Sequence, residues 1–226
     1  MKQTQPKGVS ELTPHMWGSN SDTSALGVVL AGGRGRRLGG GKASVELAGR
    51  PLIEYPLEAI AAAGLEAVVV TKPGEAQLRS RGSFVLNSRI KEPRDSVSVL
   101  EEPLEPRHPL CGIVAALRLG RPIVAVACDL PFVAPGLIEL LAATPEPLVV
   151  PALDGHPQPL LARYDPSLLP RLEAALEREE PLTRTIEALA PRLLTEGDLT
   201  RFGDPRRLLF NVNDREDLRR AEALLL

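Results

Sequence analysis

The sequence is poor in aromatic residues, histidine and cysteine, and these shortages exclude several kinds of site. Aromatic residues make up 3% of the 226 residues, so the core has to be built from aliphatic side chains. The three histidines, His15, His108 and His156, are far apart and lack the spacing of a zinc site. The two cysteines, Cys111 and Cys128, lie in apolar surroundings, which indicates buried thiols and not a disulfide framework. We therefore expect a protein of the reducing cytoplasm.

Long apolar runs and a strong net charge are absent as well. The formal net charge is −2, so no general attraction to nucleic acid or to an anionic membrane is expected. No run has the roughly 20 apolar residues that a membrane-spanning helix needs, and the first ten residues lack the apolar core of a signal peptide. Residues 1–25 are polar and without periodicity, which predicts a disordered N-terminal extension before a single domain over residues 26–226.

Short apolar runs alternate with helical patterns along this domain. Runs that predict strands lie at residues 28–30, 67–71, 83–86, 97–102, 122–127, 148–150, 160–164, 193–194 and 208–212. Helical spacing is present at residues 110–119, 135–143, 166–176 and 182–189, in a helix that Pro51 can open, and in a terminal helix after Asp214. Asp214 and Asp217 resemble a capping box for that last helix. This alternation predicts an α/β protein with one layered sheet.

Residues 27–42, GVVLAGGRGRRLGGGK, are the most informative stretch. An apolar strand leads into six glycines and three arginines within eleven residues, and the stretch ends on Lys42. A basic glycine loop after a strand presents backbone N–H groups and positive charge to phosphates. The stretch therefore predicts a phosphate-binding loop.

The two common phosphate-binding loops do not fit these residues. A Walker loop needs Ser or Thr after its lysine, but Ala43 follows Lys42. A dinucleotide-binding fingerprint needs a third glycine where the chain has Leu38, which argues against an NAD-dependent dehydrogenase. A flexible surface loop remains as an alternative, but such a loop has no use for Arg36 and Arg37 between its glycines.

Two further positions have side chains suited to a phosphate and metal site. Asp129 follows the apolar run 122–127, and such an Asp can bind Mg²⁺ when nucleotide phosphates supply the other oxygens. A turn or a helix cap is the alternative for Asp129. Asn211 and Asn213 lie one residue apart after the last apolar run, where one of them can face the same crevice. A turn with an asparagine cap is the alternative there, and the residues alone favour it.

The glycine loop resembles the signature of the sugar-nucleotide-type nucleotidyltransferases, and most closely that of the molybdenum cofactor guanylyltransferases. The matching positions are Leu30, Ala31, Gly32, Gly33, Arg37, Leu38, Gly39 and Lys42. The segments at 128–132 and 109–112 are similar to the family's metal-binding Asp motif and to its Pro-Leu-Ala-Gly motif. The loop departs from the pattern at Gly41, where the family usually has an Asp before the lysine.

The resemblance implies a three-layer α/β/α Rossmann-like nucleotidyltransferase fold with a mostly parallel mixed sheet. It implies catalytic roles for Arg37, Lys42 and Asp129. It implies a nucleotide site formed by Leu30, Ala31, Gly32, Gly33, Gly39, Lys42, Lys72, Glu102 and Asp129. Mg²⁺ would be the cofactor, held by Asp129 and Asn213. The acceptor would contact Gln158, Arg184 and Asn211, although a proline-stiffened turn and an exposed helical arginine are the alternatives for the first two.

The base site is where the chain departs furthest from these relatives. They carry an Asn after the second strand and an Asp after the third or fourth, and those places hold Lys72 and Glu102 here. Glu102 can accept two hydrogen bonds from guanine, whereas Lys72 cannot replace the paired donor and acceptor of an asparagine. The Leu-Ala-Gly-Gly form of the loop is similar to the enzymes that use GTP, and Leu-Ala-Ala-Gly to those that use CTP.

The resemblance therefore implies transfer of GMP from GTP to molybdenum-molybdopterin, with release of pyrophosphate. GTP and molybdopterin are the expected substrates, and other proteins of molybdenum cofactor synthesis are candidate partners. The alternatives are a cytidylyltransferase for molybdopterin, a transferase for another small phosphorylated acceptor, and a non-catalytic GTP-binding carrier.

Overall fold

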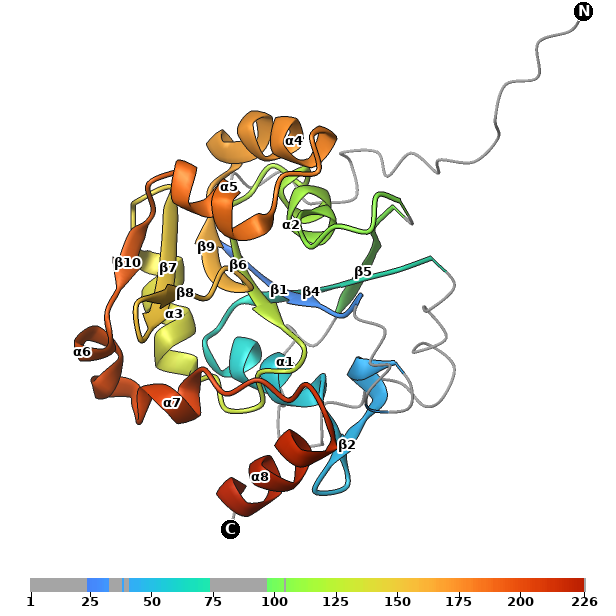
Figure 1. The fold of residues 1–226 in the computed structure, drawn as a ribbon, viewed down its shortest axis with the longest axis vertical. Coiled ribbons are helices and arrows are strands. Elements are labelled where there is room, and N and C mark those ends of the chain that lie inside the picture. Colours follow the sequence, from blue (N-terminus) through green and yellow to red (C-terminus); the bar gives the residue numbers. More distant parts are fainter. Residues whose placement is uncertain (1–23, 33–37, 39–40, 74–96, 104, 226) are drawn as a thin grey trace, which may run out of the picture.

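The computed structural model describes residues 24–32, 38, 41–73, 97–103 and 105–225. Its centre is a mixed sheet whose strands follow the order β10-β7-β9-β6-β1-β4-β5, with β8 paired to β7 (Figure 1). The strands are β1 (Leu26–Leu30), β4 (Glu66–Thr71), β5 (Ser98–Glu101), β6 (Ile123–Ala127), β7 (Leu148–Leu153), β8 (His156–Pro157), β9 (Leu161–Tyr164) and β10 (Arg192–Leu194). Among the described strands of this sheet, only β8 and β9 run against the others, so the prediction of a mostly parallel mixed sheet is confirmed.

The register of the central strands decides where the loops emerge. Leu30 at the end of β1 lies opposite Val70 of β4 and Ala127 of β6. Because these strands are parallel, their carboxyl ends meet at one edge of the sheet, where α/β proteins bind ligands. The glycine loop and the residues after β4, β5 and β6 all start from this edge.

Helices cover both faces of the sheet, which gives three layers (Figure 1). One face packs against α1 (Glu54–Ala62) and α3 (Pro135–Ala143), and the other packs against α2 (Leu110–Leu117), α4 (Leu169–Glu177) and α5 (Leu182–Ala188). Alternate residues of a strand point to opposite faces, so Val29 joins the first core and Val28 the second. The predicted three-layer α/β/α architecture is therefore confirmed.

A third apolar core lies outside the two sheet faces. Its fully buried members, Leu47, Leu52, Val212 and Ala221, come from a small hairpin and from the C-terminal region. The hairpin consists of β2 (Glu46–Leu47) and β3 (Arg50–Pro51), and Ala221 lies on α8 (Arg215–Leu225). Figure 1 shows α8 beside this hairpin, below the main body of the domain. We call these four residues and their partly buried neighbours the third core.

The structure corrects two predictions about elements. Pro51 does not open a helix but ends β3, and α1 begins at Glu54, which leaves Pro56 in the first turn, where no N–H is needed. Residues 208–212 do not form a strand. Asp204 caps the short helix α7 (Pro205–Leu208) by accepting a hydrogen bond from the Arg206 N–H, and an irregular segment follows it. Another short helix, α6 (Glu196–Leu199), was not predicted.

Other boundaries shift or stay undescribed. Ala25, which we assigned to the N-terminal extension, is buried against the core, and Ser24 binds Arg121 through its carbonyl and hydroxyl oxygens. The structured domain therefore begins before residue 26. The strand predicted at residues 83–86 lies outside the described residues. In the described part of the chain, no helix has the length and apolar character that crossing a membrane requires.

The contact between β1 and α1 gives a test of the fold. A Cβ on Gly27 would overlap the buried side chain of Ile60, so Gly27→Ala should lower the free energy of unfolding by about 1–3 kcal/mol. The control is Gly197→Ala, because Gly197 is exposed on α6, where a Cβ meets nothing closer than 3.7 Å. Urea unfolding of both variants measures the difference. Equal stability of the two variants would contradict the described packing of β1 on α1.

Candidate functional site

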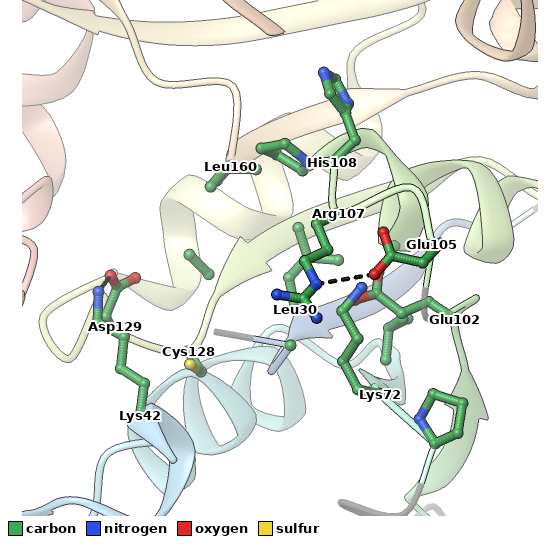
Figure 2. Close-up of a pocket in the computed structure, with 16 residues that line it drawn as sticks. Leu30, Lys42, Lys72, Glu102, Glu105, Arg107, His108, Cys128, Asp129 and Leu160 are labelled. Atoms are coloured by element: carbon green, nitrogen blue, oxygen red, sulfur yellow. Dashed lines mark hydrogen bonds and ion pairs between the residues drawn. The ribbon is translucent and has the colours of Figure 1, made fainter. Parts of the chain in front are cut away.

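A cavity of about 610 Å³ lies at the carboxyl edge of the central strands (Figure 2). Its wall combines apolar strand ends with charged residues from the loops that follow them. The lining residues are Leu30, Gly32, Lys42, Val70, Lys72, Pro73, Glu102, Glu105, Arg107, His108, Pro109, Gly112, Ala127, Cys128, Asp129 and Leu160. A mostly apolar cleft with a few convergent polar groups is the usual form of a small-molecule site.

Lys42, Asp129 and Asn213 meet at one end of this cavity. Lys42 begins the short 3-10 turn Lys42–Ser44 after the glycine loop, and its ammonium group forms an ion pair with the Asp129 carboxylate. The same ammonium donates a hydrogen bond of 2.9 Å to Asn213 Oδ1. The side chains of Lys42 and Asp129 are only 15% and 11% exposed, so this pair is largely removed from water. Residues predicted from three distant parts of the sequence thus lie together.

Asp129 keeps an oxygen available at this point. Its Oδ2 faces Lys42, while its Oδ1 is buried and has no hydrogen-bond partner among the described residues. A buried carboxylate oxygen without a partner is costly unless a ligand satisfies it. The described part of the chain brings no three His, Cys, Asp or Glu residues together as a metal site. The carboxylate and amide oxygens of Asp129 and Asn213 are of the kind that a hard cation binds when a phosphate and water supply its other ligands.

Lys72 and Glu102 form a second charged pair, on a different side of the cavity (Figure 2). Lys72 Nζ lies 2.9 Å from Glu102 Oε1 and 3.2 Å from the carbonyl oxygen of Pro103. Two glycines make room for the Glu102 carboxylate. A Cβ on Gly32 would overlap its Oε1, and a Cβ on Gly112 would lie 3.0 Å from its Oε2. The Gly32 of the predicted loop thus accommodates a residue of the predicted base site.

The segment between β5 and α2 forms the rim of the cavity. Arg107 and Glu105 are paired at 3.0 Å and are largely exposed at the rim. His108 contacts the start of α2 and the segment after α4. Its Nδ1 accepts a hydrogen bond from the Leu110 N–H, and its Nε2 lies 2.8 Å from the carbonyl oxygen of Glu180. Our sequence reading did not assign these rim residues a role. The one sequence feature that marked this segment was its prolines, Pro103, Pro106 and Pro109, ahead of the helical pattern at 110–119.

The third core connects the three segments that carry Lys42, Asp129 and Asn213. Val45, three residues after Lys42, packs against it, and so does Phe132, three residues after Asp129. Val212, directly before Asn213, is one of its fully buried members, and the Val212 N–H donates a 2.9 Å hydrogen bond to the Asp129 carbonyl oxygen. One apolar cluster therefore fixes three backbone segments relative to one another.

The other predicted site residues fall into three groups. Gly33, Arg37 and Gly39 lie outside the described residues, so their predicted roles stay predictions. Ala31 is buried behind the cavity wall, with its N–H bound to the carbonyl oxygen of Val70. The predicted acceptor residues do not line the cavity. They are Gln158, which follows β8, Arg184 on α5, and Asn211, whose amide nitrogen binds the Leu209 carbonyl oxygen.

Cys128 lies in the cavity wall but is not suited to act as a nucleophile. Burial, with a smaller contribution from the neighbouring Asp129, raises the pKa of its thiol to about 12. Since the thiolate is the reactive form, this raised pKa and the burial of the thiol argue against Cys128 as a nucleophile.

Comparison with known proteins identifies similar sequences and structures. The MobA-like NTP transferase domain matches residues 27–193. A probable molybdenum cofactor guanylyltransferase of Thermococcus kodakarensis is 33% identical and covers 88% of this chain and 94% of its own. A molybdenum cofactor guanylyltransferase of Vibrio atlanticus is 32% identical and covers 87% of this chain and 94% of its own.

Solved structures agree with these matches. The crystal structure of molybdopterin-guanine dinucleotide biosynthesis protein A from Archaeoglobus fulgidus has a TM-score of 0.72 and 30% identity, with coverage of 88% of this chain and 97% of its own. A nucleotidyl transferase from Methanothermobacter has a TM-score of 0.66 at 20% identity, which supports the fold alone. It covers 89% of this chain and 97% of its own.

The buried thiols give a test of the site. Cys111 and Cys128 are 1% and 3% exposed, and the high pKa of Cys128 keeps it protonated. A disulfide reagent at pH 8 should therefore modify fewer than about one in ten folded chains within an hour. In guanidinium chloride the same reagent should modify both thiols of each chain. Rapid modification of Cys128 in the folded protein would contradict the described burial.

Proposed function

The chain belongs to the MobA-like NTP transferase domain family, and we propose that it transfers GMP from GTP to molybdenum-molybdopterin. Family membership makes it a nucleotidyltransferase. The observation that carries the proposal further is the meeting of Lys42, Asp129 and Asn213 at the carboxyl edge of the sheet. The names of the relatives support guanine as the base and molybdopterin as the acceptor.

The proposed reaction forms one phosphoanhydride bond and breaks another. An oxygen of the acceptor phosphate attacks the α-phosphorus of GTP, the bond from that phosphorus to the bridging oxygen breaks, and pyrophosphate leaves with the electron pair. The acceptor phosphate is already a competent nucleophile, so no covalent intermediate on the protein is required. Catalysis then consists of positioning and of neutralising the developing charge.

Lys42 is the residue proposed to neutralise that charge. Its ammonium group is already held at the cavity by Asp129 and Asn213, so little reorganisation is needed when a phosphate arrives. A phosphate oxygen of GTP would take over part of the interaction that Asp129 now makes with Lys42. The glycine loop, with Arg37, is expected to hold the β and γ phosphates through its N–H groups.

Asp129 and Asn213 are the residues proposed to hold Mg²⁺. The buried Oδ1 of Asp129 has no partner among the described residues. The side-chain amide oxygen of Asn213 has a second lone pair beside the one that faces Lys42. When bound, Mg²⁺ would supply further positive charge to the transferring phosphate and to the acceptor. The two residues themselves fix where that charge is placed, because the Asp129 backbone is tied to Val212.

Lys72 and Glu102 are the residues proposed to read the base. The edge of guanine offers an acceptor at O6 and donors at N1 and N2. An ammonium group is donor-only and a carboxylate is acceptor-only, so Lys72 beside Glu102 matches that order of groups. Cytosine offers one donor followed by two acceptors and would leave the carboxylate without the two N–H groups it needs. This match favours GTP over CTP even though the family asparagine is absent.

Fewer observations support the proposed acceptor site. Gln158, Arg184 and Asn211 are assigned by resemblance, and the described cavity reaches this side of the molecule through Leu160. Gln158 is two residues before Leu160 in sequence, which supports a contact between Gln158 and an acceptor bound at that end. The acceptor is therefore expected to enter between Leu160 and Asp129.

Removing the charge of Lys42 or of Asp129 tests the proposed reaction. Lys42→Ala and Asp129→Asn should each lower turnover with GTP, Mg²⁺ and molybdopterin by more than about a hundredfold, as removal of one charge-stabilising group does in other transfer enzymes. The measurement is pyrophosphate release, with thermal unfolding to confirm the fold. Arg118→Ala, which removes only an exposed pair with Glu173, is the control and should keep wild-type turnover. Near-normal activity of either site variant would exclude the proposed mechanism, and a wild-type protein that binds GTP without releasing pyrophosphate would favour a carrier.

Changing the carboxylate of the second pair tests base selection. Glu102→Gln keeps the size of the side chain but replaces one acceptor oxygen by a donor, so it should lower kcat/KM for GTP by about ten- to a hundredfold. The value for CTP should change by less than about threefold, because that base does not depend on a carboxylate here. Pyrophosphate release measured with each nucleotide gives both values. An equal loss with GTP and CTP would show that Glu102 does not select the base.

A further inference from the structure

The position of Lys42 depends on a residue that is itself exposed. Its two partners differ, since Asp129 follows a buried central strand while Asn213 lies in the irregular segment between α7 and α8. Gly41, directly before Lys42, has no side chain that could hold the lysine, and Asn213 is exposed. Some other contact must therefore keep Asn213 in place.

Two backbone hydrogen bonds fix the Asn213 segment. On one side, the Val212 N–H donates to the carbonyl oxygen of Asp129 at 2.9 Å. On the other side, the N–H of Asn213 itself donates to Asp217 Oδ2 at 3.0 Å. Asp217 lies in the first turn of α8, and its own N–H donates to Asp214 Oδ1 at 3.0 Å. The carboxylate of Asp217 thus reaches out of its helix to the residue that holds Lys42.

The helix that carries Asp217 is fixed against the hairpin that follows Lys42. Ala221 is the buried residue of α8, and it packs in the third core with Leu47 and Leu52 of the hairpin region. Leu218 packs against the same core from the next position after Asp217. Figure 1 shows how close α8 lies to β2. The packing of α8 against the hairpin therefore restricts movement of Asp217 relative to Lys42.

We propose that Asp217 is a positioning residue of the transfer reaction: it holds the Asn213 backbone so that the Asn213 amide oxygen keeps Lys42 at the reaction centre. The inference rests on the proposed function, because it assigns Lys42 a role in catalysis. Asp217 acts through Asn213 and does not touch the substrate.

A purely structural role for Asp217 makes a different prediction. A carboxylate in the first turn stabilises a helix through its dipole and through capping, whatever lies nearby. Glu216 also lies in the first turn, but its carboxylate pairs with Arg220 on the outer face of α8 and does not contact Asn213. Glu216→Ala therefore removes a first-turn charge without removing the support of Asn213.

The experiment compares three full-length variants with the wild type at a temperature well below their unfolding. Asp217→Ala should lower kcat for pyrophosphate release from GTP, Mg²⁺ and molybdopterin by about tenfold, with KM for GTP changed by less than about threefold, because the base and loop contacts are unaffected. Asp217→Asn keeps an oxygen that can accept the Asn213 N–H, so it should restore most of kcat. Glu216→Ala should keep wild-type kcat.

Amide hydrogen exchange gives a readout that does not require turnover. Exchange at the Asn213 N–H should become at least about tenfold faster in Asp217→Ala than in Glu216→Ala, while exchange at Ala221 stays equal in the two. Unchanged exchange at Asn213, or a kcat of Asp217→Ala within twofold of Glu216→Ala, would overturn the inference. If the wild type itself releases no pyrophosphate, the proposed function fails, and the exchange result alone decides whether Asp217 supports Asn213.

Discussion

The ion pair between Lys42 and Asp129 is the interaction on which the rest of the site depends. Its two residues are 87 positions apart in sequence, and both side chains are largely buried. Either charge alone would be costly at this depth, so the turn at Lys42 and the end of β6 depend on the two charges meeting. In the proposed reaction, a phosphate would replace Asp129 at Lys42 while a cation would replace Lys42 at Asp129.

The three apolar cores have separate parts in holding this arrangement. The two cores on the sheet fix the ends of β1, β4, β5 and β6, and so the starting points of Lys72, Glu102 and Asp129. The third core fixes what the sheet does not reach, namely the turn at Lys42 and the segment at Asn213. The site combines residues held by the two sheet cores with residues held by the third core. It therefore needs the C-terminal region, even though the family match ends at residue 193. Apolar residues between 194 and 225 pack in the first and third cores, together with the rest of the described chain.

The sequence predicted the sheet well because buried parallel strands carry a strong local signal. The runs at 67–71 and 122–127 are rich in β-branched residues and contain no charged side chain, and both became central strands. The run at 208–212 looked similar, but Pro205 and its cap at Asp204 form a helical turn first, and Leu208 and Leu209 then fill the first core without pairing to a strand. Lys42, Asp129 and Asn213 were predicted as one site from motifs. The support from Asp217 was not, because a contact that leaves a helix cannot be distinguished from a capping pattern in sequence.

A crystal structure with GTP and Mg²⁺ tests the central claim most directly, because it shows what replaces the partners of Lys42 and Asp129. The account predicts that Lys42 Nζ contacts an oxygen of the α-phosphate, that Asp129 Oδ1 binds the metal ion, and that the guanine edge faces Lys72 and Glu102. A triphosphate bound elsewhere, with the ion pair between Lys42 and Asp129 intact, would contradict it.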